Sequence, residues 1–295
     1  FTEHCYYKKR KGDRMAKSIQ DTYTLSNGVK IPVMGLGVYK NVDETELETA
    51  VSSALEYGYR HIDTAKVYKN EKGVGRAIKN SGVPREDIFV TTKVWNNDQG
   101  YENTLKAFDK SLKDLNMDYI DLYLIHWPMP GTYVDTWKAL EKLYKDGKVR
   151  SIGVSNFNPH HLQDLFDECE IKPMLNQVEY HPHLAQLELR AFCKEHDILL
   201  EAWSPLKRGR MFDEPDLVEL SEKYGKTPAQ IILRWDVETG VSTIPKSVSA
   251  DRVRENGDIF DFELTSEEVE AITALDRHER VGKDPDTVTL DSFAD

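Results

Sequence analysis

The feature that most constrains this chain is a regular alternation of apolar, strand-like segments with amphipathic, helix-like segments from residue 33 onward. The expected strands are 33–39, 60–65, 87–95, 120–128, 149–156, 173–182, 198–206 and 241–247. The expected helices are 43–58, 71–82, 100–116, 134–147, 159–169, 184–197, 215–239, 250–260 and 265–276. Most of the strands are continuous apolar runs, which is typical of strands covered on both faces. Alternation of this kind predicts a parallel sheet.

Eight strand–helix units fit a closed (β/α)8 barrel, or TIM barrel, and an open doubly wound sheet is the alternative. The open sheet usually carries the fingerprint G-x-G-x-x-[GA] after a strand. Here "GLGVYK" has Lys40 in the sixth position, and "GVGRAI" has Ile78 there and lies in an expected helix. We therefore predict an α/β fold of the (β/α)8 type. A β-hairpin with a two-residue turn at Asn27-Gly28 precedes it, and an extra C-terminal helix with a capping box follows it.

The composition excludes some classes of function. Fifty-one acidic and 39 basic residues give a formal charge of −12, which disfavours nucleic acid as a partner. No apolar run is long enough to span a membrane, and the three cysteines form no disulfide or zinc motif. We expect a cytoplasmic monomer with no membrane partner. Residues 1–14 are expected to be a disordered leader or an added extension, and residues 15–295 a single domain.

Polar side chains stand at the ends of the expected strands, where barrels of this type carry their functional groups. Asp63, Lys93 and His126 end three successive strands and are 30 and 33 residues apart. Polar residues often simply begin loops, but three inward-pointing titratable groups must satisfy one another. The spacing therefore indicates a functional cluster. Further candidates at strand ends are Ser155, Asn156, Gln177, Trp203, Lys246 and Ser247.

Tyr68 follows Asp63 by five residues and is expected to lie beside Lys93 and His126. A free phenol has a pKa near 10 and is a poor acid at neutral pH. We expect the ammonium of Lys93, held by Asp63, to lower the pKa of Tyr68. A neutral His126 would orient a carbonyl group. The set suits protonation of a carbonyl oxygen, and a cofactor must then supply the hydride.

The segment "IPKSVSADRVREN", residues 244–256, surrounds the last strand and the start of its helix with cationic and hydroxyl groups. Loops in this position that lead into a helix N-terminus bind phosphate in such barrels. Lys246 and Arg252 suit the additional phosphate of NADP. A solvated, capped helix is the alternative interpretation.

Together these segments resemble the aldo-keto reductase superfamily over about residues 20 to 285. The matching motifs are "GYRHIDTAKVYKNE", "LYLIHWP", "GKVRSIGVSNF", "QVEYHP" and "IPKSVSADRVREN". The set is most similar to bacterial glyoxal/methylglyoxal reductases or 2,5-diketo-gluconate reductases. The resemblance implies NADPH-dependent carbonyl reduction without a metal.

The resemblance also implies roles for individual residues. The catalytic residues would be Asp63, Tyr68, Lys93 and His126, with Tyr68 as the proton donor. The cofactor would be bound by Gly37, Val38, Tyr39, Asp63, Ser155, Asn156, Gln177, Trp203, Ser204, Leu206, Lys246, Ser247, Val248, Ser249, Arg252, Glu255 and Asn256. The substrate would be bound by Tyr39, Trp95, His126 and Trp127. Trp203 stands where many members carry a tyrosine stacked on the nicotinamide ring.

The short segment "MPGTYVD" after "HWP" indicates an open pocket for small aldehydes, dicarbonyls or keto-sugars. An NADPH-binding regulatory or sensor subunit with little turnover is an alternative. A metal-dependent barrel hydrolase is a second alternative, but it would need an H-x-H pair on an early strand, where this chain has only "HID". His181 and His183 lack a third ligand at suitable spacing and are expected to be loop histidines.

Overall fold

The computed structural model describes residues 15–293, so the expectation for residues 1–14 lies outside the described part of the chain. The strands are β1 (Thr22–Thr24), β2 (Lys30–Pro32), β3 (Leu36–Gly37), β4 (His61–Asp63), β5 (Phe89–Val94), β6 (Ile120–Ile125), β7 (Val149–Ser155), β8 (Leu175–Glu179), β9 (Leu199–Trp203) and β10 (Ser242–Thr243). The α-helices are α1 (Glu44–Tyr57), α2 (Glu71–Asn80), α3 (Tyr101–Leu115), α4 (Tyr133–Lys145), α5 (Pro159–Glu168), α6 (Leu187–Glu195), α7 (Pro215–Tyr224), α8 (Pro228–Glu238), α9 (Ala250–Gly257) and α10 (Ser266–Thr273). Single 3-10 turns are η2 (Lys66–Tyr68), η3 (Arg85–Asp87), η4 (Asn96–Asp98), η5 (Lys207–Gly209) and η6 (Leu290–Phe293).

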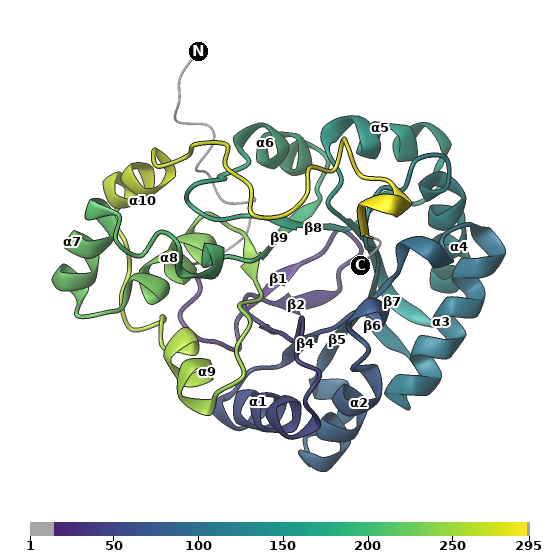
Figure 1. The fold of residues 1–295 in the computed structure, drawn as a ribbon, viewed down its shortest axis with the longest axis horizontal. Coiled ribbons are helices and arrows are strands. Elements are labelled where there is room, and N and C mark those ends of the chain that lie inside the picture. The colour runs from purple at the N-terminus through teal and green to yellow at the C-terminus, as the bar shows by residue number, and fades with distance from the viewer. Residues whose placement is uncertain (1–14, 294–295) are drawn as a thin grey trace.

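Strands β3 to β10 form one parallel sheet in the order of the chain, with the helices around its outside (Figure 1). Its two edges meet, because parallel bridges join Met34 to Thr243 and Gly37 to Lys246. The Gly35 N–H also donates to the Thr243 carbonyl over 2.9 Å. The predicted (β/α)8 barrel is therefore confirmed, and its closure brings the first and last strand ends together.

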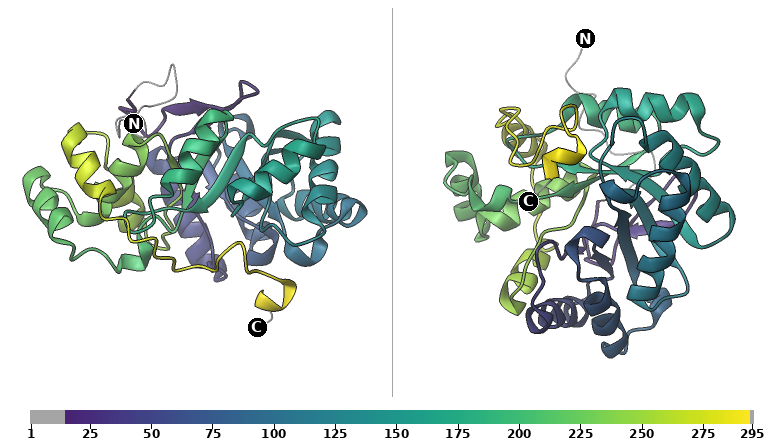
Figure 2. Two further views of the ribbon diagram at one scale, coloured as in Figure 1. Left: turned by 90° about the horizontal axis from the view of Figure 1, so that it is seen from above. Right: turned by 45° about the vertical axis from the view of Figure 1, so that its right-hand side comes forward.

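The hairpin of β1 and β2 lies at one end of the barrel, and the segment that follows α10 lies at the opposite end (Figure 2). The predicted hairpin is present, but its turn is one residue longer than expected. Leu25 N–H donates to Val29 O, and Gly28 N–H donates to Leu25 O, both over 2.8 Å. Gly28 has φ +86°, the left-handed conformation that a three-residue hairpin turn requires.

The expected helix 215–239 is two helices, α7 and α8. Gly225, with φ 61°, caps α7, and Thr227 starts α8 through a capping box with Gln230. Pro228 occupies the first position of α8, where its missing N–H is not needed. These local signals therefore end one helix and begin another. The predicted capping box of the last helix forms between Thr265 and Glu268.

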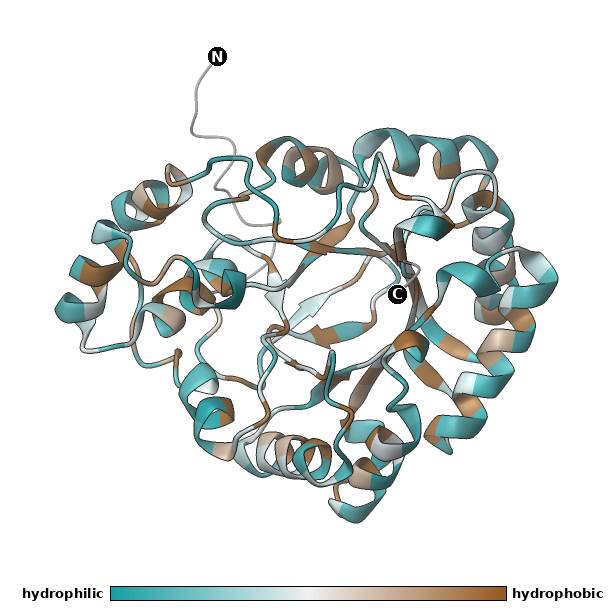
Figure 3. Ribbon diagram, in the orientation of Figure 1, coloured by the Kyte–Doolittle hydropathy of each residue, from teal (hydrophilic) through white to brown (hydrophobic). Residues whose placement is uncertain are grey.

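The core holds the strand ends in place. Strands β5 and β6 are buried along their whole length, as expected for a barrel wall covered on both faces. The surrounding helices combine hydrophobic and hydrophilic residues (Figure 3). Trp137 of α4 and Trp235 of α8 are buried. Within residues 15–293, no helix has the length and apolar character that crossing a membrane requires.

Candidate active site

Four candidate residues meet at the carboxyl ends of β4, β5 and β6. Asp63 is the last residue of β4, Lys93 is the last but one of β5, and His126 directly follows β6. Tyr68 ends η2, the single turn after β4. The Tyr68 ring centroid lies 5.2 Å from Lys93 Nζ and 5.8 Å from the His126 ring centroid. The structure therefore groups Tyr68 with the three residues that the strand-end pattern indicated.

Lys93 is fully buried, and two oxygen atoms hold its ammonium. Nζ donates to Asp63 Oδ1 over 2.7 Å and to Thr64 O over 2.9 Å. Burial by itself would lower the pKa of Lys93, but the negative charge of Asp63 and its hydrogen bond outweigh burial and raise that pKa. Lys93 is therefore a fixed cation beside the Tyr68 ring at neutral pH.

The pKa of Tyr68 differs from the expectation. Burial raises it to about 12, although the neighbouring Lys93 ammonium acts to lower it. The predicted net lowering is wrong for the free protein, because the desolvation of a phenolate outweighs the attraction of one ammonium. The phenol is consequently protonated at neutral pH and holds a proton that it can donate. Lys93 is placed to stabilise the phenolate that remains.

His126 lies in the wall of the site, next to the Trp95 ring at 5.1 Å between centroids. Burial lowers its pKa well below the usual range, and the Lys93 ammonium lowers it further. Its buried Nδ1 has no hydrogen-bond partner among the described residues. A neutral imidazole carries one N–H, so His126 can donate a hydrogen bond to a carbonyl oxygen.

Gln177, on β8, joins two buried carboxylates. Its Nε2 donates to Asp63 Oδ2 over 2.7 Å and to Glu201 Oε1 over 2.8 Å. Both N–H groups are then used, and Gln177 Oε1 accepts no hydrogen bond from any described residue. The amide therefore offers one free acceptor, which suits the carboxamide of a nicotinamide.

Ser155, Asn156 and Trp203 form a connected group beside Gln177. Ser155 Oγ donates to the Gln177 carbonyl over 2.7 Å, and Asn156 Nδ2 donates to the His126 carbonyl over 2.9 Å. Trp203 Nε1 donates to Asn156 Oδ1 over 2.8 Å, so the indole orientation is fixed. The Trp203 indole therefore lies next to the Asn156 and Gln177 amide groups. A nicotinamide stacked on the indole would need such neighbours.

The candidate phosphate site lies where β10 leads into α9. Ser249 caps α9 by accepting a hydrogen bond from the Arg252 backbone N–H over 3.3 Å. Lys246 and Arg252 are exposed, and neither forms an ion pair with another residue of the described range 15–293. Two unpaired cations at a helix N-terminus suit a phosphate group. Glu255 is already engaged, because Thr227 Oγ1 donates to it over 3.0 Å.

The other residues expected at the cofactor lie around the same end of the barrel. They end or follow β3, follow β9, precede α9 or, for Asn256 alone, lie in the last turn of α9: Gly37, Val38, Tyr39, Ser204, Leu206, Ser247, Val248 and Asn256. The bridge between Gly37 and Lys246 brings the first and last of these groups side by side.

Aromatic rings surround the group of four. Tyr39 contacts the Tyr68 ring edge-on at 5.2 Å between centroids, and Trp95 contacts His126. Phe293 lies 5.3 Å from Trp95 and 5.2 Å from Trp127, again between ring centroids. The substrate residues expected from the sequence therefore share one aromatic wall.

Sequence reasoning missed the contribution of the C-terminal segment and of Glu201. Val288 and Phe293 pack with Trp127 at the mouth of the site, but their segment carries no periodic pattern that would predict this. Glu201 is the one acid in the apolar run "ILLEAW". An acid that interrupts an apolar strand could have indicated Glu201 as a candidate site residue.

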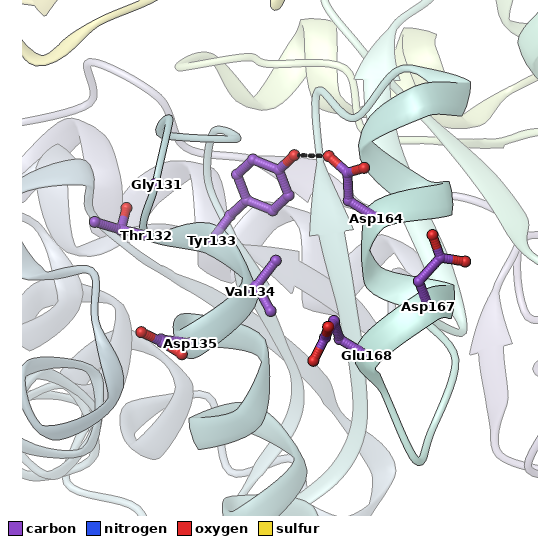
Figure 4. A pocket seen from close by; sticks show the side chains of 8 residues that line it. All are labelled: Gly131, Thr132, Tyr133, Val134, Asp135, Asp164, Asp167 and Glu168. Atoms are coloured by element: carbon purple, nitrogen blue, oxygen red, sulfur yellow. Dashed lines mark hydrogen bonds between the residues drawn. The ribbon is translucent and has the colours of Figure 1, made fainter.

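A separate hollow of about 410 Å³ lies between α4 and α5 (Figure 4). Its lining combines carboxylates with Tyr133, whose hydroxyl donates to Asp164. Asp135, Asp167 and Glu168 complete the acidic side. None of the four candidate catalytic residues lines this hollow.

Comparisons with known proteins agree with this geometry. The sequence model of the "Aldo/keto reductase family" matches residues 33–277. Glyoxal reductase of Bacillus subtilis is 58% identical over 272 residues, which cover 92% of this chain and 99% of the relative. Methylglyoxal reductase DkgA of Escherichia coli is 49% identical over 266 residues, covering 89% and 96%. A variant of Gox0644, solved in complex with NADPH, superposes with a TM-score of 0.88 at 43% identity, covering 92% of this chain and 99% of that one.

Proposed function

The chain belongs to the aldo/keto reductase family, and we propose that it reduces glyoxal, methylglyoxal and similar small dicarbonyls with NADPH. The observation that carries the proposal is the buried Lys93–Asp63 ion pair, whose ammonium lies 5.2 Å from the Tyr68 ring centroid. Relatives at 58% and 49% identity bear the names glyoxal reductase and methylglyoxal reductase, which supports this substrate class.

In the proposed reaction, Tyr68 donates its proton to the carbonyl oxygen, which becomes a hydroxyl group. Lys93 stabilises the resulting phenolate, and Asp63 holds Lys93 in position. His126, neutral because burial lowers its pKa, donates a hydrogen bond that orients the carbonyl oxygen. NADPH, when bound, supplies the hydride for the carbonyl carbon.

NADPH suits the donor set of this chain. The free Oε1 of Gln177 can accept from the nicotinamide carboxamide, and the fixed indole of Trp203 can stack on the ring. Lys246 and Arg252 can pair with the 2′-phosphate that distinguishes NADPH from NADH. This choice of cofactor agrees with the NADPH bound to the Gox0644 variant.

The pocket favours small substrates. The loop between β6 and α4 spans only 126–132, and Gln99 anchors it: Nε2 donates to Trp127 O over 2.7 Å, and Thr132 Oγ1 donates to Gln99 Oε1 over 3.1 Å. An anchored loop keeps Trp127 against Phe293. A fixed aromatic wall can pack against a small planar substrate, so we propose small dicarbonyls rather than keto-sugars.

The proposal is tested by NADPH consumption with glyoxal, methylglyoxal, a simple aldehyde and a keto-sugar acid. We expect kcat/KM for the two dicarbonyls to exceed that for the keto-sugar acid by about tenfold or more, the effect of a well-fitted pocket. NADPH binding without turnover on any carbonyl would favour a regulatory NADPH-binding subunit instead. A preference for the keto-sugar acid would remove the assignment to small dicarbonyls.

A further inference from the structure

Glu201 is a buried acid that the reaction described above does not use. It lies in β9, opposite Gln177 in β8, and is 0% exposed. Its Oε1 accepts from Gln177 Nε2 over 2.8 Å, and its Oε2 accepts from Ser242 Oγ over 2.9 Å. Both carboxylate oxygens therefore have donors, and one of these donors is the proposed carboxamide-binding residue.

The charges inside this part of the barrel do not balance. Lys93 is the one ammonium, whereas Asp63 and Glu201 are two carboxylates. His61 Nδ1 lies 3.7 Å from Glu201 Oε2, but burial lowers the pKa of His61 to about 4, so this ring is neutral at neutral pH. Ionised Glu201 thus leaves one negative charge in excess. Burial raises the pKa of Glu201 against its two hydrogen bonds, so a positive charge nearby would stabilise the carboxylate.

A metal ion does not fit as the missing positive charge. His61, Asp63 and Glu201 have the spacing of a metal-binding group. However, the Lys93 ammonium already occupies Asp63 Oδ1, and Gln177 and Ser242 occupy the oxygens of Glu201. A cation at this point would displace an ammonium and two hydrogen-bond donors. A positive charge that balances Glu201 can approach from the side of Gln177 that faces away from both acids.

Glu201 also decides which way the Gln177 amide faces. Carboxylates only accept hydrogen bonds, so two of them require both N–H groups of the same amide. The Gln177 NH2 group meets this requirement, with one hydrogen for Asp63 and one for Glu201. Oε1 consequently points away from both acids, toward the side where the nicotinamide is proposed to bind.

We propose that Glu201 is a positioning residue that acts through Gln177: it fixes the amide for the nicotinamide carboxamide, and its charge favours the oxidised, positively charged ring over the reduced, neutral one. The inference rests on the proposed use of NADPH. It predicts that Glu201 stabilises bound NADP+ relative to bound NADPH, and so assists departure of the hydride from the reduced ring.

The test measures dissociation constants of NADP+ and NADPH by calorimetry for wild type and Glu201→Gln. Glutamine keeps the shape and can still accept from Gln177, so the charge is the main difference. We expect the dissociation constant of NADP+, divided by that of NADPH, to rise about tenfold in Glu201→Gln. This is the order of effect of one unit charge in a protein interior. Glu201→Thr, a second neutral variant with a residue suited to strands, should shift the ratio in the same direction if Glu201→Gln fails to fold.

Two control variants separate charge from packing. Ser242→Ala removes one hydrogen bond to Glu201 but leaves the carboxyl group and its Gln177 donor in place, so the ratio should change less than in Glu201→Gln. Glu141→Gln alters a buried acid of α4 that binds the backbone N–H groups of Glu170 and Ile171, away from the site. It should leave the ratio unchanged.

An equal loss of affinity for both cofactors in Glu201→Gln, or no change in either affinity, would overturn the role of Glu201. Wild type that binds neither cofactor would instead overturn the proposed function.

Discussion

Replacement of Lys93 by methionine isolates the charge at the centre of the site. Methionine nearly matches the lysine stem in volume and is flexible, so packing is largely kept. Asp63 is 1% exposed and would lose its 2.7 Å hydrogen bond from Lys93 Nζ. Its remaining side-chain partner, the Gln177 amide, cannot replace a unit charge. Removing one member of a buried ion pair typically lowers the free energy of unfolding by about 3–5 kcal/mol, and we expect a loss of that size.

Urea denaturation of wild type, Lys93→Met and the double variant Lys93→Met/Asp63→Asn measures this loss. The double variant has no unpaired carboxylate at position 63, and it should recover at least about 2 kcal/mol of the unfolding free energy. Lys106→Ala, an exposed site on α3, should stay within about 0.5 kcal/mol of wild type. A loss below about 1 kcal/mol in Lys93→Met, or no recovery in the double variant, would refute charge compensation as the role of Lys93.

Two further predictions concern the cofactor and the pH dependence of stability. Lys246→Ala and Arg252→Ala should each lower the affinity for NADPH by about tenfold or more, because a charge-assisted hydrogen bond contributes about 1.5–3 kcal/mol. The affinity for NADH, which has no 2′-phosphate, should fall far less. Equal losses of affinity for both cofactors in fluorescence titrations would remove the 2′-phosphate assignment. Burial lowers the pKa of His61 to about 4, so below its unfolded value near 6.5 the unfolded chain binds a proton that the folded chain does not. The contribution of His61 to the free energy of unfolding should therefore fall by about 2 kcal/mol between pH 7 and pH 5. His61→Asn should remove that part of the decrease in urea denaturation, and an unchanged decrease would contradict it.

The barrel was predictable because each strand–helix unit carries its own local signals. Asp63, Lys93 and His126 could be grouped from the sequence because parallel strands place equivalent ends at one level. The division of 215–239 was missed because the caps at Gly225 and Thr227 lie inside a continuous helical pattern. Boundaries of this kind depend on single residues, whereas the elements themselves depend on many.

Other features depend on burial and long-range contacts that local patterns do not encode. The direction of the Tyr68 pKa shift required the balance between desolvation and Lys93, and only the packed site provides it. Phe293 reaches Trp95 and Trp127 from a segment without periodicity. Glu201 was visible as an acid within an apolar run, but its contact with Gln177 depends on the register of β8 and β9.

The most direct test of the account compares wild type with Tyr68→Phe, measuring methylglyoxal turnover and NADPH affinity side by side. Phenylalanine keeps the ring contacts with Tyr39 and His126 and removes only the hydroxyl group, which carries the proton that Tyr68 donates. We predict that turnover falls by about 10²–10⁴-fold, the usual contribution of a general acid, while NADPH affinity stays within about twofold. A variant that keeps the wild-type rate would contradict the assignment of Tyr68 as the proton donor.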